Sequence, residues 1–218
     1  MGFFTLTLPL AIAYGAIPLA ALILYLNLRS APWRKLTAPG AFSAWCFSII
    51  ALPLLWRFDV PLMEGAGLHL LGLPIFVLMF GRRLAMAGIG MSVLACTAAF
   101  DGIWANVGVN LLLLAIAPAY CGDAVMRATE RFLPHHIFIY LLGNGFFGAL
   151  AMLAAIGTLS LAVHQALAAT PLGADAIAYM LLLAWGESFL TGFLLTIFTV
   201  YRPEWVLTFD DEVYLRGK

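Results

Sequence analysis

The sequence has very few charged residues for its length. Only 10% of its 218 residues are Asp, Glu, Lys or Arg, whereas 64% are apolar. A soluble domain is usually about a quarter charged. With so few charges, a soluble chain of this size cannot cover its own core with polar surface. The shortage therefore excludes an ordinary water-soluble domain and indicates that the lipid bilayer is the solvent of this chain.

The charges that are present balance, and the cysteines are few and scattered. Eleven basic residues match eleven acidic residues, so no excess of positive charge indicates a nucleic-acid partner. Cys46, Cys96 and Cys121 lie far apart in apolar runs and form no CxxC pair. They predict neither a disulfide framework nor a zinc site.

The sequence also lacks the short motifs that mark common enzyme classes. It contains no HExxH, GxSxG, P-loop or GxGxxG pattern. We therefore predict that the chain is not an enzyme and that it does not hydrolyse ATP by itself. If it moves a solute actively, a partner protein must supply the energy.

Long apolar stretches make up most of what is present. A helix needs about 20 apolar residues to cross the hydrocarbon core of a bilayer. The stretches that come near this length are 8–28, 41–58, 67–80, 84–100, 103–126, 137–164 and 177–201. The third is short and is interrupted by glycine and proline. We predict an all-α fold, a polytopic membrane helix bundle of about seven transmembrane helices in a single domain, followed by a short tail over 202–218.

The connecting segments alternate in charge. Basic residues occupy the first, third and fifth connections and the tail. These basic residues are Arg29, Arg34, Lys35, Arg82, Arg83, Arg127, Arg131, Arg202, Arg216 and Lys218. Acidic residues occupy the second, fourth and sixth connections, and Arg57 is the one basic residue near them. Because positive residues mark cytoplasmic loops, the pattern predicts seven crossings of a bacterial inner membrane. The N-terminus then lies outside, and the C-terminal tail lies in the cytoplasm.

One carboxylate lies deep inside a predicted span. Glu187 follows about ten residues of the last stretch, which places it near the middle of the bilayer. A charge there is expensive, so the side chain must be protonated, paired or turned toward a polar cavity. We predict that Glu187 faces the bundle interior, in either a structural or a substrate-binding role.

Other polar residues fall near the outer ends of two predicted spans. His69 lies in the glycine-rich start of the third stretch, and a neutral imidazole is a common transition-metal ligand. Asn110 lies about 10 Å into the fifth stretch by helical rise, and Asn106 lies one turn earlier on the same face. We predict that His69 and Asn110 line one outward-facing polar pocket, whose mouth the amine of Met1 can reach. Glu187 and Asn106 are further substrate-binding candidates for this pocket. Hydrogen bonding between neighbouring helices is the alternative role for each.

The remaining polar residues have simpler interpretations. His135 and His136 follow a proline at a helix start, where they are expected at the membrane interface. His164 ends a helix on the outer side, and we expect it to be solvated. Asp123 and Arg127 are four residues apart on one helix, and this spacing predicts an ion pair.

Three stretches resemble a known family. Residues 67–72 read Gly-Leu-His-Leu-Leu-Gly, residues 100–110 contain Phe-Asp-Gly and Asn-Val-Gly-Val-Asn, and residues 186–191 read Gly-Glu-Ser-Phe-Leu-Thr. They are similar, in the same order, to stretches of the CbiM/NikM family. Members of that family are the substrate-specific membrane components of energy-coupling-factor transporters for cobalt and nickel. The tail at 200–205 is similar to a subgroup of such permeases.

The resemblance implies a function, and it also shows one position at which this chain differs from the family. It implies a cargo that is a divalent transition metal, such as Co, Ni, Cu or Zn, bound with the help of His69 and Met1. It also implies cytoplasmic ATPase subunits and a coupling membrane protein as partners, the latter meeting small residues over 148–157. Family members that capture cobalt or nickel begin Met-His, whereas this chain begins Met1-Gly2.

The absence of a histidine at position 2 leaves two main interpretations of the function open. The chain is then either a transporter component with a different ligand set, or a non-transporting subunit or scaffold of a larger membrane complex. A haem protein is the weakest reading, because two histidines would have to lie at matched depth on facing helices.

Overall fold

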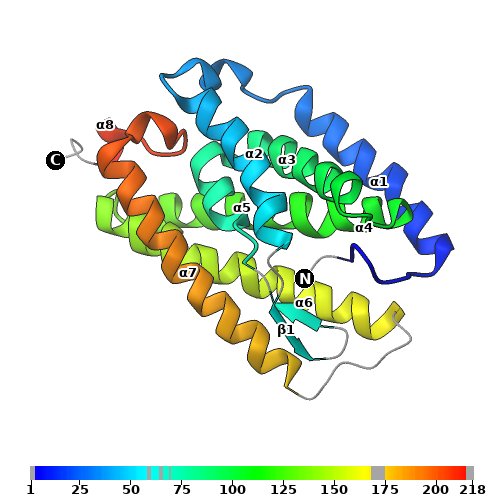
Figure 1. Cartoon of the computed structure of the whole chain (residues 1–218). Coiled ribbons are helices and arrows are strands. Elements are labelled where there is room, and N and C mark those ends of the chain that lie inside the picture. The colour runs from blue at the N-terminus through cyan, green and yellow to red at the C-terminus, as the bar shows by residue number, and fades with distance from the viewer. Residues whose placement is uncertain (1–2, 58–59, 64–65, 69, 168–174, 215–218) are drawn as a thin grey trace.

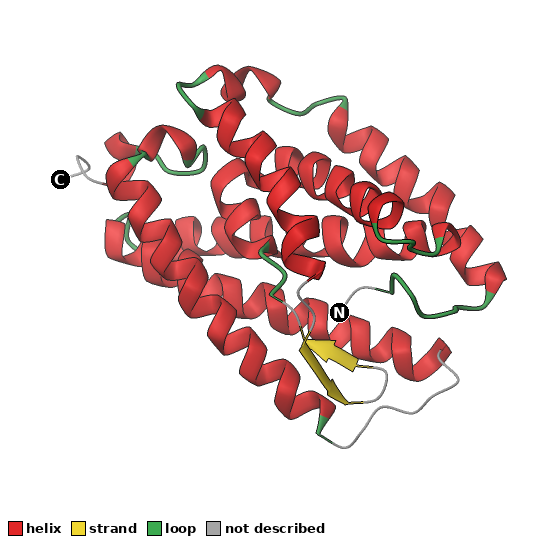
Figure 2. Ribbon diagram, viewed as in Figure 1, coloured by secondary structure: helices red, strands yellow, loops and turns green. Residues whose placement is uncertain are grey.

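The computed structural model of the chain is a bundle of helices (Figure 1). It describes residues 3–57, 60–63, 66–68, 70–167 and 175–214. Within these ranges, the exception to helix and loop is one short β-hairpin (Figure 2). The predicted all-α membrane bundle is therefore confirmed.

The helices follow one another with short connections. The α-helices are α1 (Leu10–Leu28), α2 (Ala41–Arg57), α3 (Leu73–Ala99), α4 (Val107–Asn110), α5 (Ala117–Phe132), α6 (Ala149–Leu167), α7 (Ala176–Tyr201) and α8 (Asp211–Tyr214). Three short 3₁₀ turns are η1 (Trp33–Thr37), η2 (Trp104–Asn106) and η5 (Pro203–Trp205). Two segments with wider π-helical turns are η3 (Leu111–Ile116) and η4 (Ile139–Gly148). The segments η2 to α5 form one helical span over 104–132, and η4 continues into α6.

Length and composition fit most of these helices to a bilayer. Among the described residues, five spans are long and apolar enough to cross one: 10–28, 73–99, 104–132, 139–166 and 176–201. The apolar helix α2 is shorter, at 17 residues. Large apolar side chains lie exposed along several of these helices, including Phe47, Leu182 and Phe193. In lipid such exposure carries no cost, because the solvent is as apolar as the side chains.

Helix α3 consists of two arms that fold back on each other at Gly81. Gly81 has φ 73° and ψ 167°, a conformation that lies outside the helical region and that favours glycine. Gly88 packs so closely on Phe76 that an added Cβ would lie 2.3 Å from the Phe76 ring. In a straight helix these residues would be about 18 Å apart along the axis. The first arm, residues 73–80, is therefore a half-helix about 12 Å long that precedes a full span.

The predicted start of the third helix is wrong. Residues 66–68 form strand β2 (Ala66–Leu68), which pairs antiparallel with β1 (Val60–Met63). Pro61 pairs with Gly67 in this hairpin. Proline and glycine are the two poorest helix formers, so the apolar character of this stretch does not outweigh its low helix propensity.

Helix α1 rests on the rest of the bundle through a close backbone contact. Its buried residues are few and mostly alanines, and Gly108 of α4 faces them. A Cβ added to Gly108 would lie 2.4 Å from the Ile17 nitrogen and 2.6 Å from the Ala16 carbonyl carbon. Only glycine lets the two helices approach this closely.

The tail packs onto the bundle at the end opposite to the hairpin (Figure 1). The Leu207 amide donates to the Met79 carbonyl at 2.7 Å, and the Thr208 hydroxyl donates to the Leu78 carbonyl. Val206 is buried. We call the end that carries α8 and Arg82 the C-terminal end, and the end that carries Phe3 and Asn106 the N-terminal end.

Candidate functional site

Two asparagines hold the segment that precedes α1. The Phe3 amide donates to Asn110 Oδ1 at 2.7 Å, and Asn106 Nδ2 donates to the Phe3 carbonyl at 2.8 Å. Asn106 Nδ2 also donates to the Leu6 carbonyl at 2.7 Å, and Asn110 Nδ2 reaches the Phe3 carbonyl at 3.3 Å. Both asparagines are completely buried. We call this arrangement the asparagine clamp.

Local structure explains why the two asparagines act together. Asn106 ends the 3₁₀ turn η2, and Asn110 ends α4 one turn later, so both amides point toward the same backbone. This confirms that they share a face. The backbone of Phe4 adds a further link, because its carbonyl accepts the Ile103 amide at 2.8 Å.

A second clamp holds the backbone where α3 begins. The Leu71 amide donates to Glu187 Oε2 at 2.9 Å, and the Gly72 amide donates to Oε1 at 2.7 Å. The Leu71 carbonyl accepts the Trp56 indole N–H, also at 2.9 Å. We call this arrangement the carboxylate clamp. It fixes both polar groups of Leu71 from two different helices, α7 and α2.

The carboxylate clamp also caps α3. Gly72 is the residue before the helix and has φ 66°, a left-handed conformation suited to glycine. Glu187 places its carboxylate at the positive end of the half-helix, which favours negative charge. The side chain is only 1% exposed, so the prediction that it faces the bundle interior is confirmed. Its oxygens are occupied by backbone amides, which gives it a positioning role.

The two clamps adjoin each other. The Phe4 ring lies with its centroid 5.8 Å from the Trp56 ring, and Trp56 is the residue that binds Leu71. Phe3 and Phe4 therefore connect the asparagine clamp to the carboxylate clamp. Helices α2, α4 and α7 contribute to one continuous constellation around the N-terminal segment.

Two predicted ligands lie outside the described residues. They are Met1 and His69. In the sequence, Met1 is two residues before Phe3, and His69 is two residues before Leu71. Each clamp thus holds a backbone position two residues from a candidate nitrogen ligand. Within the described part of the chain, no group of three or more His, Cys, Asp or Glu is placed to hold a metal.

A histidine that the sequence predicts to be solvated, His164, lies buried next to the asparagine clamp. His164, near the end of α6, is 8% exposed, and its ring centroid lies 6.4 Å from that of Phe3. That expectation was wrong, because the N-terminal segment covers this end of α6. The signal in the sequence was only a histidine near the end of an apolar run, which does not reveal a contact with residue 3.

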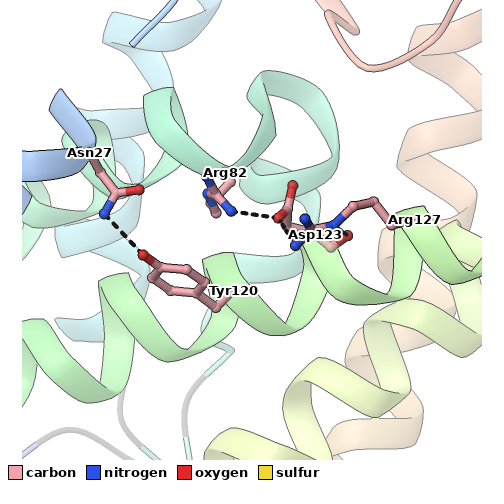
Figure 3. Close-up of polar contacts among 5 residues, drawn as sticks. All are labelled: Asn27, Arg82, Tyr120, Asp123 and Arg127. Carbon is pink, nitrogen blue, oxygen red and sulfur yellow. Dashed lines mark hydrogen bonds and ion pairs between the residues drawn. The ribbon is translucent and has the colours of Figure 1, made fainter. Parts of the chain in front are cut away.

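The C-terminal end carries a different polar cluster (Figure 3). Asp123 Oδ2 accepts Arg82 at 2.8 Å and Arg127 at 2.5 Å, so the predicted pair of Asp123 and Arg127 is confirmed. The guanidinium of Arg82 lies over the Tyr120 ring, 5.0 Å from its centroid, and Asn27 donates to the Tyr120 hydroxyl at 3.1 Å. These charges border a cavity of about 710 Å³ between the bundle and the tail.

Comparison with known proteins identifies the family of this chain. The sequence model of the family described as "CbiM: Cobalt uptake substrate-specific transmembrane region" matches residues 2–205. A comparison with curated proteins finds no significant match. The family match covers nearly the whole chain, including the residues of both clamps.

Proposed function

Because the chain belongs to the family of cobalt-uptake substrate-specific transmembrane regions, we propose that it captures a divalent transition-metal ion for uptake across the bacterial inner membrane. Capture takes place at the outer face, at the N-terminal end of the bundle. Cytoplasmic ATPase subunits and a coupling membrane protein supply the energy, in the manner of an energy-coupling-factor transporter.

The adjoining clamps are the observation that carries this proposal. Asn110 and Asn106 fix the backbone at Phe3, while Glu187 and Trp56 fix it at Leu71. A binding site gains affinity when its ligands are held in place before the ion arrives, because less conformational freedom is lost on binding. The clamps fix the backbone at Phe3 and Leu71, which in the sequence are two residues from Met1 and His69.

The chemistry of those two ligands suits the proposed cargo. The Met1 amine and the His69 imidazole both offer nitrogen, which first-row transition metals bind well. Asn106, Asn110 and Glu187 belong to the same site, and they contribute through the backbone segments that they hold. Their hydrogen bonds to backbone leave the metal to the nitrogen donors.

The partner surface proposed for the small residues of 148–157 is narrower than the sequence implies. Gly148 and Ala149 are buried inside the chain, and a Cβ on Gly148 would meet Val125 at 3.0 Å. Ala151 and Ala155 are exposed on the same helix. Contact with a coupling protein then rests on the exposed pair, where small side chains allow close helix packing.

Metal binding by the purified protein tests the proposal. We expect the detergent-purified chain with a native N-terminus to bind about one Co²⁺, measured by calorimetry and elemental analysis. His69→Ala should weaken binding at least about tenfold, the scale of lost support around a metal. His135→Ala is the matched control, because His135 is an exposed histidine at the C-terminal end and should bind Co²⁺ like wild type.

The alternative is a non-transporting membrane subunit, and one sequence feature favours it. Gly2 stands where the resemblance to the CbiM/NikM family implies a histidine in members that capture metal. A wild-type protein that binds no Co²⁺, Ni²⁺, Cu²⁺ or Zn²⁺ would contradict the proposed capture and support this alternative. Co-purification with a respiratory or oxidase complex would then identify the assembly.

A further inference from the structure

His164 lies against the N-terminal segment, and none of the described residues gives its side chain a polar partner. Its side chain is buried, and its ring is tilted against that of Phe3, with the centroids 6.4 Å apart. Asn106 and Asn110 hold the Phe3 backbone from another helix. Among the described residues, neither ring nitrogen makes a hydrogen bond, and Nδ1 has no access to solvent. An imidazole at the outer end of a span would normally turn a nitrogen to water.

Two neighbouring polar atoms share this condition. Ser160 lies one turn before His164 on the same face of α6, and its buried hydroxyl has no partner among the described residues. Asn106 Oδ1 is also buried and unpaired there, although the amide nitrogen of Asn106 binds Phe3. Asn106 and His164 thus both contact Phe3, and each has a buried polar atom without a partner among the described residues.

An unused buried polar atom is expensive. Leaving a buried donor or acceptor unsatisfied costs about 1–3 kcal/mol, and lipid offers no water to compensate. A side chain selected only to fill space beside Phe3 would be apolar. Among the described residues nothing pairs with this nitrogen and this hydroxyl, which lie on one helical face, and both are therefore available to a polar ligand.

We propose that His164 supplies an imidazole nitrogen to the metal ion that the chain captures beside its N-terminal segment. This assignment rests on the proposed function, which provides the metal. A neutral imidazole has the lone pair that transition metals prefer, and it is the commonest ligand for them in proteins. Ser160, one turn away, offers a hydroxyl to hold the imidazole or a metal-bound water.

A variant that keeps the ring separates ligation from packing. His164→Phe preserves an aromatic ring against Phe3 and removes both nitrogens, and thermal unfolding verifies that it folds. We expect wild type to bind one Co²⁺ and His164→Phe to bind it at least about tenfold more weakly. The control His135→Ala should bind as wild type does.

A spectroscopic count completes the test. In protein loaded with Cu²⁺ alone, pulsed electron paramagnetic resonance counts the coordinated imidazoles, and His164→Phe should have one fewer than wild type. Equal Co²⁺ affinity and an equal imidazole count in His164→Phe would overturn the assignment while leaving the proposed function standing. A wild type that binds no metal would overturn both.

Discussion

The two ends of the bundle use polar side chains in different ways. At the N-terminal end, Asn106, Asn110 and Glu187 bind backbone groups of segments far away in the sequence. At the C-terminal end, Asp123 binds the side chains of Arg82 and Arg127 (Figure 3). The first pattern fixes the course of the main chain, whereas the second pairs charges that remain partly exposed.

The difference in burial explains why each end uses its own chemistry. Glu187 is 1% exposed, so its carboxylate must find donors inside the protein. The Arg127 side chain is 65% exposed, and it can stay solvated with or without Asp123. We therefore expect the hydrogen bonds at the N-terminal end to contribute strongly to the order of the backbone. The ion pairs at the C-terminal end should contribute only weakly. Four substitutions test this contrast.

Glu187→Leu should have the largest effect. It leaves the Leu71 and Gly72 amides unsatisfied, and each buried amide without a partner costs about 1–3 kcal/mol, so the total loss should be about 2–6 kcal/mol. Thermal unfolding followed by tryptophan fluorescence measures it. Glu187→Gln keeps one acceptor oxygen and should lose less. A Glu187→Leu protein as stable as wild type would remove the carboxylate clamp from the explanation.

Gly108→Val should follow in size. The added carbons would collide with the α1 backbone at Ile17, and such overpacking costs about 1–3 kcal/mol. Gly15→Ala is the matched control on α1, because no atom lies within 4 Å of its added Cβ. It should leave stability unchanged or raise it by at most about 1 kcal/mol. Equal melting temperatures for the two variants would mean that α1 is not held through this contact.

Asn110→Ala should loosen the N-terminal segment locally. It removes the acceptor of the Phe3 amide, and one hydrogen bond is worth about 0.5–1.5 kcal/mol, so exchange of that amide should quicken by up to about tenfold. Hydrogen exchange in ¹⁵N-phenylalanine-labelled protein reports it. Asn106→Ala leaves this acceptor in place and should change the exchange less. The reverse order would place the main hold on the segment at Asn106.

Asp123→Asn should have the smallest effect. Ion pairs that are partly exposed are worth about 0–1 kcal/mol, and salt screens them. The stability difference from wild type should therefore shrink in high salt, whereas the loss in Glu187→Leu should not. Unfolding curves at low and high ionic strength compare the two. A large, salt-independent loss in Asp123→Asn would erase the contrast between the ends.

The helix positions were predictable because they depend on local hydrophobicity. The reversal at Gly81 was also marked, since Arg82 and Arg83 interrupt the apolar run there. Glu187 was placed in the interior correctly because the cost of a charge in lipid leaves few choices. Each of these features can be predicted from neighbouring residues or from the properties of the lipid solvent alone.

The partners of the polar residues were not predictable from the sequence. The bond between Asn110 and Phe3 joins residues 107 positions apart, and the bond between Leu71 and Glu187 joins residues 116 apart. His164 was expected to be solvated because nothing local indicates that the N-terminal segment folds over it. The apolar content of residues 66–68 favours a helix, but the poor helix propensity of glycine prevails there and the segment forms a strand.

The central claim is that the N-terminal end is an ordered metal-capture site, and Co²⁺ affinity tests it most directly. Calorimetry on wild type, Asn110→Ala and Asp123→Asn compares one substitution from each end. We expect about one bound Co²⁺ in wild type and unchanged affinity in Asp123→Asn. In Asn110→Ala the affinity should fall at least about tenfold, because support around a metal site is worth about 10–100-fold in affinity. Binding that is absent from wild type, or weakened equally by both substitutions, would contradict it.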